Sequence, residues 1–426
     1  MGATHNDQAG SGQNSGLLSE GIAALSLNLD GSYFHSVSAK IIPADPKAGY
    51  LAAQAEIDAA IKRVLLSGQY ILGSELEAFE KEFSKWLGVP GAVGVANGTD
   101  ALELALRAAG LGAGDKVVTV ANTVTATVSA IGATGAKPVF VDVEPSTLLM
   151  DLDALEVLLT RMRDPRIKAV VPVHLYGQAV DMPRLLELAE QHRLIVIEDS
   201  AQAHGSTVGD KKAGAWGHLA AFSFYPTKNL GAFGDAGAVV SRDPLLLEQV
   251  RLLRQYGWRK RYVSDLPGRN SRLDEIQAAI LRVRLARLEN ENVRRDELAQ
   301  HYLTALKDCP VKLPLVAVNR THCWHQFVIR TNRRDELKSF LEKREIVCGI
   351  LYPVPVHRQP AYHDAALSLP HTEESCAQVL SLPLHPGLTD ADVARVTHEV
   401  NSFFSAEKNQ DEPVARTGKT APTSAT

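Results

Sequence analysis

The stretch FSFYPTKNLGAFGDAG, residues 222–237, places a single lysine, Lys228, among aromatic residues and glycines. It begins inside an apolar run from His218 to Tyr225 that is typical of a buried β-strand. Burial disfavours the charged form of an amine, and a neutral amine can form a Schiff base with a carbonyl. A surface lysine that follows a strand is the plain alternative, because most lysines lie at the surface. This stretch by itself leaves both interpretations open.

The composition is that of an ordinary globular protein. The chain has 426 residues, of which 45% are hydrophobic and 22% charged, and its net charge is −4. The length suits two or three domains, and no overall positive charge indicates a nucleic acid or an anionic membrane as partner. The four cysteines include no C-x-x-C pair, so we expect no metal site and no disulfide scaffold. This cysteine usage fits a cytoplasmic protein.

One uncharged segment, residues 117–136, is long enough to raise the question of a membrane span. Its five threonines, together with Asn122 and Ser129, make it too polar for that. We predict a buried strand followed by a buried helix. The N-terminus has no basic region followed by an apolar run, so we expect no secretory signal.

Short β-branched runs alternate with helical patterns through the first two thirds of the chain. The runs are 92–97, 116–121, 137–143, 167–176 and 194–200. Continuous apolar strands between helices predict a mostly parallel sheet that is covered on both faces. Ligands of such sheets bind beyond the C-terminal strand ends. Polar segments that follow the strands should therefore converge, namely Asn97, His174–Gln178, Asp199–Gln202 and Tyr225–Lys228.

Four regions are predicted along the chain. Residues 1–37 are rich in Gly, Ser, Asn and Ala and are expected to be disordered or loosely attached, and the polar residues 405–426 are expected to be a disordered tail. Between them we expect a large domain over 38–290 and a smaller C-terminal domain over 291–404.

The smaller domain is predicted to be α+β. A helical stretch at about 271–300 leads into it from the large domain, with apolar residues at helical spacing. Its segments CWHQFVIR (323–330) and VCGILY (347–352) have the pattern of strands, and a helix is expected between them near 333–345.

Four motifs carry polar groups that suit one chemistry. ANGTDAL (96–102) and FSFYPTKN (222–229) offer groups for a phosphate, VIEDSAQAHG (196–205) ends a strand with Asp199, and GRNSRLDEIQAA (268–279) precedes a helix. A helix N-terminus favours phosphate, although Asp199 could equally be a helix cap. Pyridoxal phosphate (PLP) requires a lysine, an acid beside its ring nitrogen and a phosphate cup. Together the motifs predict a PLP site.

The chain resembles the DegT/DnrJ/EryC1/StrS family of sugar aminotransferases from about residue 40 to residue 404. The motifs that carry the resemblance stand in the same order: SGQYILGSELEAFEKEF, ANGTDALELALRAAGLGAGD, PVHLYGQ, VIEDSAQAHG, FSFYPTKNLGAFGDAG, GRNSRLDEIQAA, YPVPVHRQPAY and VLSLPLHPGL. The resemblance implies an α/β protein with the PLP-dependent transferase fold type I. This fold has a large domain with a mostly parallel central sheet and a smaller C-terminal α+β domain.

The same resemblance implies roles for individual residues. Lys228 would hold PLP as a Schiff base, Asp199 would contact the pyridine nitrogen, and Gln202 would lie near the ring hydroxyl. The remaining cofactor contacts that it implies are Gly98, Thr99, Ser223 and the adjacent Asp100, with Asn270 reaching in from a partner subunit. The active unit is accordingly expected to be a homodimer with shared sites.

Two positions depart from the family pattern. Val124 stands where members commonly carry an aromatic residue that stacks on the cofactor, so we assign no stacking residue. Leu351 precedes Tyr352 and Pro353 where many members have histidine. The candidates for substrate contacts are Tyr225, Arg272, Tyr352 and His357, and an exposed loop histidine is the alternative for His357.

The expected activity is transfer of an amino group from an amino acid, with glutamate as the expected donor, to a nucleotide-linked keto-sugar. The motifs are most similar to those of members acting at C3 of a dTDP-3-keto-6-deoxyhexose. A C4-keto nucleotide sugar and a keto-cyclitol are alternative acceptors. A sugar dehydratase of this family would have histidine in place of Lys228. A regulatory protein on this fold is the non-enzyme alternative, which the intact Lys228, Asp199 and Gln202 disfavour.

A basic segment at 251–272 is the only candidate for a nucleic-acid surface. A solvated face is the commoner meaning of such a run, and phosphate groups of the substrate are another use for its arginines. We therefore expect neither a nucleic acid nor a membrane as partner.

Overall fold

The computed structural model describes residues 40–408. The predicted extension over 1–37 lies outside this range, as does most of the predicted tail. The last helix, α13 (Asp390–Lys408), continues past residue 405, where the tail was expected to begin. All further statements concern the described residues.

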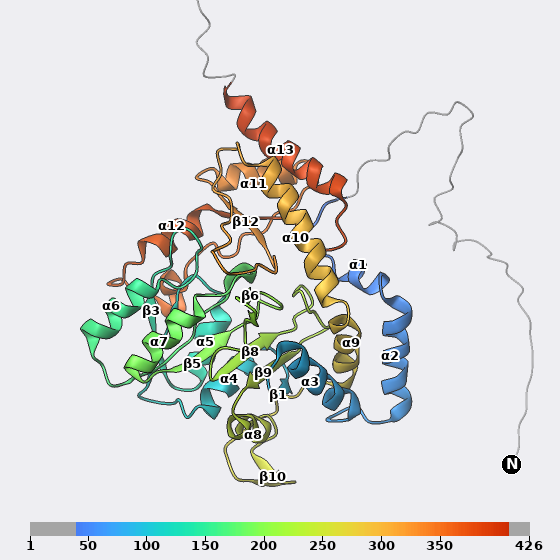
Figure 1. Cartoon of the computed structure of the whole chain (residues 1–426), viewed down its shortest axis with the longest axis vertical. Helices are drawn as coiled ribbons and strands as arrows, with labels where there is room; N and C mark the ends of the chain where they lie inside the picture. Colours follow the sequence, from blue (N-terminus) through green and yellow to red (C-terminus); the bar gives the residue numbers. More distant parts are fainter. Residues whose placement is uncertain (1–39, 409–426) are drawn as a thin grey trace, which may run out of the picture. The chain divides into compact units, whose positions relative to one another are not determined.

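A seven-stranded sheet forms the centre of the larger part of the chain (Figure 1). Its order is β1-β9-β8-β5-β4-β2-β3, and only β9 runs antiparallel to its neighbours. The bounds are β1 (Gly91–Val95), β2 (Lys116–Val120), β3 (Lys137–Val141), β4 (Ile167–Val170), β5 (Ile195–Asp199), β8 (Leu219–Ser223) and β9 (Gly237–Ser241). This confirms the mostly parallel sheet predicted from the apolar runs.

Helices cover both faces of this sheet, because successive strand residues point to opposite sides. Val117 of β2 packs with α4, α5 and α8, whereas its neighbour Val118 packs with α6 and α7. These helices are α4 (Gly98–Ala108), α5 (Thr125–Ala133), α6 (Leu152–Met162), α7 (Met182–His192) and α8 (Pro244–Leu253). The uncharged segment 117–136 is thus the strand β2 and the helix α5, as predicted. Within residues 40–408 no helix is both long and apolar enough to cross a membrane.

Three helices join the N-terminal segment to the rest of the fold, and one of them, α3, packs against β1. They are α2 (Gln54–Ser67), α3 (Ser74–Leu87) and α9 (Glu275–Leu285), and α1 (Pro46–Leu51) precedes them. Figure 1 shows α2 and α3 beside α9. Buried aromatic rings of α3 pack against the end of β8 and the residue after it: Phe79 contacts Phe224, and Phe83 contacts both Phe222 and Phe224.

The C-terminal part has a hydrophobic cluster of its own, with Tyr302, Trp324, Phe327 and Val396 among its fully buried members. The elements of this C-terminal part are α10 (Leu288–Ala305), β12 (Phe327–Arg330), α11 (Arg334–Glu342), α12 (Pro370–Gln378), β13 (Val379–Leu382) and α13. The division into domains at residues 290 and 291 remains a prediction.

Two sequence predictions in this part are wrong in detail. Residues 347–352 form no strand: Gly349 makes only an isolated bridge to Ser381, and β12 pairs instead with β13. The helical stretch at 271–300 is two helices, α9 and α10, which meet at Ala286 and Arg287. No proline or glycine stands at this break, so the sequence holds no local signal for it.

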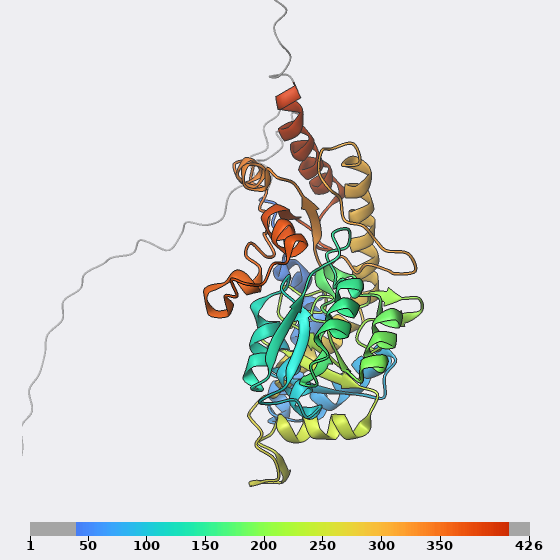
Figure 2. The same cartoon turned by 90° about the vertical axis from the view of Figure 1, so that its left-hand side faces the viewer.

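A short hairpin follows α8. It consists of β10 (Trp258–Lys260) and β11 (Val263–Ser264), and Figure 2 shows it projecting at the bottom of the view, beyond α8. Its basic and aromatic side chains are largely exposed, with Tyr262 at 73%. The remaining strands, β6 (Thr207–Val208) and β7 (Lys211–Lys212), form another small hairpin.

The N-terminus of α3 depends on one buried carboxylate. Glu275 is 2% exposed and accepts three backbone hydrogen bonds, from the N–H groups of Gly73 (2.7 Å), Glu75 (2.9 Å) and Leu76 (3.1 Å). Free N–H groups at a helix start favour negative charge. This carboxylate therefore joins α3 to α9.

We predict that Glu275→Gln lowers the free energy of unfolding by about 2–3 kcal/mol, since a charge-assisted acceptor is replaced by an amide with one acceptor oxygen. Urea unfolding followed by circular dichroism measures this. The matched control is Glu77→Gln, which alters an exposed carboxylate in the first turn of the same helix. It should change stability by less than about 0.5 kcal/mol. Equal effects of the two substitutions would contradict the proposed link between α3 and α9.

Candidate active site

The polar segments that follow the parallel strands meet, as predicted. The backbone N–H of His174, after β4, donates to the carbonyl of Asp199 at the end of β5 (3.1 Å). The N–H of Tyr176 donates to the side-chain oxygen of Gln202 (2.7 Å). Because β5 lies between β4 and β8, the segments after all three strands are neighbours.

Asp199 is held by donors on both carboxylate oxygens. Its side chain is 8% exposed, and it accepts a hydrogen bond from the hydroxyl of Thr127 (2.8 Å) and another from the N–H of Ala201 (3.2 Å). The Thr127 hydroxyl is in turn 2.8 Å from that of Thr123. These contacts fix the direction in which the carboxylate points. Among the described residues no helix begins directly after Asp199, so the alternative of a helix cap is wrong: the bond from Ala201 is a contact within a turn. The bond to Thr127 was not foreseen.

Lys228 lies in the loop after β8 and is only partly exposed. Within residues 40–408 its ammonium group makes no hydrogen bond or ion pair. Burial lowers the pKa of Lys228 from 10.5 to about 8, and the nearby Asp199 carboxylate opposes this shift. About a tenth of such amines are neutral at pH 7, far more than for an ordinary lysine with a pKa near 10.4, which is the direction that the sequence suggested for a nucleophile.

The strand-to-helix turn at Gly98 is packed closely against the end of β8. A Cβ atom on Gly98 would lie 2.6 Å from Cβ of Ser223. The helix α4 begins at Gly98, and its cap, Asn97, accepts a hydrogen bond from the N–H of Asp100 (2.8 Å). The N–H groups of Gly98 and Thr99 and the hydroxyls of Thr99 and Ser223 are therefore grouped at one helix N-terminus, which favours an anion.

Gln202 links this group of residues to the C-terminal part of the chain. Its amide nitrogen lies 3.1 Å from the hydroxyl of Tyr352, and burial raises the pKa of that phenol to about 12. The hydroxyl of Tyr176 bonds to the carbonyl of Leu351. Tyr352 is thus brought to the predicted site. Tyr225, three residues before Lys228, is 53% exposed.

Four predicted residues are not brought into this group. The carboxylate of Asp100 pairs with Arg269 (3.1 Å), and its N–H is used by Asn97, so it has no polar group left for a phosphate. Asn270 is exposed and forms a backbone bridge to Gln255. Arg272 is partly buried, and its Nε has no hydrogen-bond partner.

His357 is the fourth of these residues. It is fully buried, which corrects the alternative of an exposed loop histidine. Its Nε2 lies 3.0 Å from Glu373, whose pKa this contact lowers to about 2. The bond fixes the short segment around His357 to the start of α12. No described contact joins His357 to Lys228 or Asp199.

Sequence reasoning missed the buried polar residues that hold the Lys228 loop in place. Asn229 donates to the side chain of Asn292 (2.9 Å) and to the carbonyl of Cys323 (2.7 Å), and it lies 3.2 Å from Nδ1 of His325. Burial, together with the charge of Lys228, lowers the pKa of His325 well below 6.5. The one sequence signal for this network is the position of Asn229 directly after the lysine.

The fold and the site together define an α/β protein whose parallel strands bring a lysine and an aspartate together at their C-terminal ends. The model of the DegT/DnrJ/EryC1/StrS aminotransferase family matches residues 52–401. The chain therefore belongs to this family, and it is an enzyme of the aminotransferase class.

A curated relative from Streptomyces venezuelae, dTDP-3-amino-3,4,6-trideoxy-alpha-D-glucose transaminase, is 50% identical over 363 residues, which cover 84% of this chain and 95% of the relative. The solved structure of DesV from S. venezuelae has a TM-score of 0.83 at 47% identity, covering 86% of this chain and 99% of that one. NtdA from Bacillus subtilis, solved with bound cofactor PMP, has a TM-score of 0.80 at 31% identity, with 87% and 86% covered. These similarities confirm the fold class predicted from the sequence.

The residues present fit a phosphate-bearing pyridoxal cofactor. The turn at Gly98 leaves no room for a Cβ atom beside Ser223, so glycine at this position lets the start of α4 lie against the end of β8, where N–H groups and hydroxyls for a phosphate come together. Lys228 has no competing hydrogen bond, and Asp199 is oriented by Thr127 and Ala201. An aromatic ring is missing at position 124, where Val124 is 39% exposed.

We predict that the Lys228 amine reacts with aldehydes with a rate that is half-maximal near pH 8, because only its neutral form is nucleophilic. Cofactor-free protein would be treated with formaldehyde and cyanoborohydride, and modification of Lys228 would be followed by mass spectrometry of its peptide. In urea-denatured protein the same peptide should react half-maximally near pH 10.4. Coincident native and denatured profiles would contradict the burial effect.

Proposed function

We propose that this enzyme transfers an amino group from glutamate to C3 of a dTDP-linked 3-keto-6-deoxyhexose, with PLP as its cofactor. The observation that carries the proposal is the unpaired, partly buried Lys228 close to Asp199 at the strand ends. The 50% identity to a transaminase named for a dTDP-3-amino sugar supports the choice of acceptor and carbon.

PLP supplies an electron sink and a carbonyl that exchanges amino groups. The chain's own residues would hold it through Lys228, through the helix start at Gly98 and Thr99, and through the hydroxyl of Ser223. The negative charge of Asp199 would keep a proton on the ring nitrogen. The hydrogen bonds that Asp199 accepts from Thr127 and Ala201 favour this role, because they fix the direction of the carboxylate. Gln202 has one further N–H to offer beside the bond to Tyr352.

Lys228 would also move the proton that amino transfer requires. An amine with a pKa of about 8 gains and loses protons readily near neutral pH, which suits a general base that later acts as an acid. An ordinary lysine, with a pKa near 10.4, would be protonated almost all the time. The burial of the loop thus prepares Lys228 for both roles.

The proposed contacts to the sugar substrate are Tyr225 and Tyr352, with Arg272 available for a phosphate group. Tyr352 is positioned by Gln202, and Tyr225 is exposed beside the lysine loop. We further propose a homodimer in the cytoplasm in which Asn270 contacts the cofactor bound by the other subunit. Asn270 is exposed and bridges to Gln255, shortly before the hairpin begins at Trp258, so it is accessible to a second copy of the chain.

The test is a product assay with purified protein, PLP, ¹⁵N-glutamate and a panel of acceptors: a dTDP-3-keto-6-deoxyhexose, its C4-keto isomer and a keto-cyclitol. We expect a ¹⁵N-amino sugar from the 3-keto acceptor, identified by mass and by NMR. Lys228→Ala should abolish turnover, and Asp199→Asn should lower kcat by about 10³-fold or more because the electron sink is weakened. Amination of another acceptor in preference would overturn the choice of carbon, and turnover by Lys228→Ala would remove the lysine from its role.

A subunit-mixing experiment tests the shared site. Lys228→Ala and Asn270→Ala proteins, each inactive or strongly impaired, are mixed under conditions that allow subunits to exchange. One site of each heterodimer would then carry both changes and the other neither, so activity should partly return. Exchange is verified with two differently tagged chains. If the chains exchange and no activity returns, Asn270 acts within its own subunit.

A further inference from the structure

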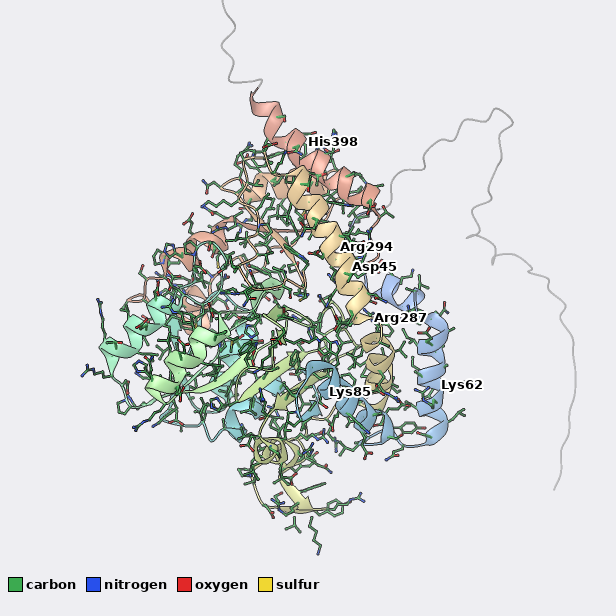
Figure 3. The ribbon with its side chains drawn as sticks, viewed as in Figure 1. Asp45, Lys62, Lys85, Arg287, Arg294 and His398 are labelled. Carbon is green, nitrogen blue, oxygen red and sulfur yellow. The ribbon has the colours of Figure 1, made fainter. Side chains whose placement is uncertain are left out.

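A cavity lies beside the Lys228 loop. It has a volume of about 320 Å³, and its lining includes Pro226, Thr227 and Lys228 but not Asp199, Gln202 or Ser223. The rest of the wall comes from residues around α1, from the end of α9 with the first half of α10, and from the loop at Pro386. Figure 3 shows Asp45, Arg287 and Arg294 close together where α10 passes α1.

The wall carries more basic than acidic side chains. Besides Lys228 it carries four arginines and only two carboxylates, those of Asp45 and Glu291; the arginines are Arg284, Arg287, Arg294 and Arg295. Two of these arginines are neutralised by carboxylates that do not line the cavity: Arg287 pairs with Glu56 (2.9 Å) and Arg294 with Asp390 (2.7 Å).

The other two arginines are buried and incompletely satisfied. Arg284 is 7% exposed and Arg295 is 5% exposed, and the Nε atom of each has no hydrogen-bond partner. Arg284 pairs with Glu291 (3.1 Å), whereas Arg295 donates only to the carbonyls of Trp324 and Leu384. Unpaired buried donors are costly, and the oxygens of a bound anion would supply the missing partners.

A glycine keeps Arg284 at the cavity. A Cβ atom on Gly49, in α1, would lie 2.5 Å from Nη1 of Arg284. Gly49 is a helical residue without positive φ, so alanine suits its backbone and only the guanidinium group would have to move. The close approach of α1 therefore sets the position of this charge.

We propose that this cavity binds a carboxylate of the amino donor, a dicarboxylic amino acid, with Arg284 as the principal cation. The proposal rests on the proposed function, in which the donor nitrogen must come close to Lys228. The donor's carboxylates are joined to that nitrogen through one or three carbon atoms, and the same cavity carries both Lys228 and the two unsatisfied arginines. Its volume is at the small end of the range for ligand sites, which suits an amino acid better than a nucleotide sugar.

The test uses glutarate, a dicarboxylate that has no amino group and cannot react. Its binding to the holoenzyme is measured by calorimetry, and binding of dTDP is measured in parallel. We expect Arg284→Gln to raise the Kd of glutarate at least tenfold and to leave that of dTDP unchanged. Gly49→Ala should also weaken glutarate binding, although it removes no charge. The KM of glutamate should rise in both variants, with the KM of the keto-sugar unaltered.

The matched control is Arg282→Gln, on the same helix, which breaks ion pairs with Glu75 and Glu82 away from the cavity. It should bind glutarate like the unaltered enzyme. Unaltered glutarate binding in Gly49→Ala and Arg284→Gln overturns the proposal, as does a loss of dTDP binding instead. If Arg284→Gln does not fold, the Kd of glutarate for Gly49→Ala still tests the proposal. If glutarate binding depends on Arg284 but the enzyme transfers no amino group to any keto-sugar, the carboxylate site is supported and the proposed function is wrong.

Discussion

Burial of the Lys228 amine beside the Asp199 carboxylate is the constraint on which the candidate site depends. Burial lowers the pKa of the amine and the nearby carboxylate raises it, and the balance leaves this pKa at about 8. This balance requires Asp199 to be held still, and the hydroxyl of Thr127 and the N–H of Ala201 do this. Since β5 and β8 are neighbours, the sheet brings the two side chains to one edge.

The packing around the Lys228 loop also holds the lysine in position. Phe222 and Phe224 fill the space under α3, while Asn229 bonds to Asn292 and Cys323. The loop is therefore held both by apolar burial and by hydrogen bonds with buried partners. These contacts hold in place a loop whose lysine has no hydrogen-bond partner of its own within residues 40–408.

Charge is distributed unevenly around this loop. One side offers a carboxylate and the start of α4, which suit a pyridinium ring and its phosphate. The adjacent cavity offers Arg284 and Arg295, which suit a carboxylate. A transaminase must accept two substrates at one reactive centre, and separate cationic groups allow it to hold an amino acid without competing for the phosphate positions.

The sequence by itself determined the alternation of strands and helices in the first two thirds of the chain, the mostly parallel sheet, and the loops that carry Lys228, Asp199 and Gly98. These follow from local patterns: apolar runs of strand length, capping residues and glycines at turns. Tertiary structure alone decided that residues 347–352 form no strand, that Thr127 reaches Asp199 across 72 positions, and that Arg284 lies against Gly49. Each of these depends on which distant segment becomes a neighbour. A hydrogen bond or a close approach between such segments produces no sequence pattern in either segment, so only the folded chain shows it.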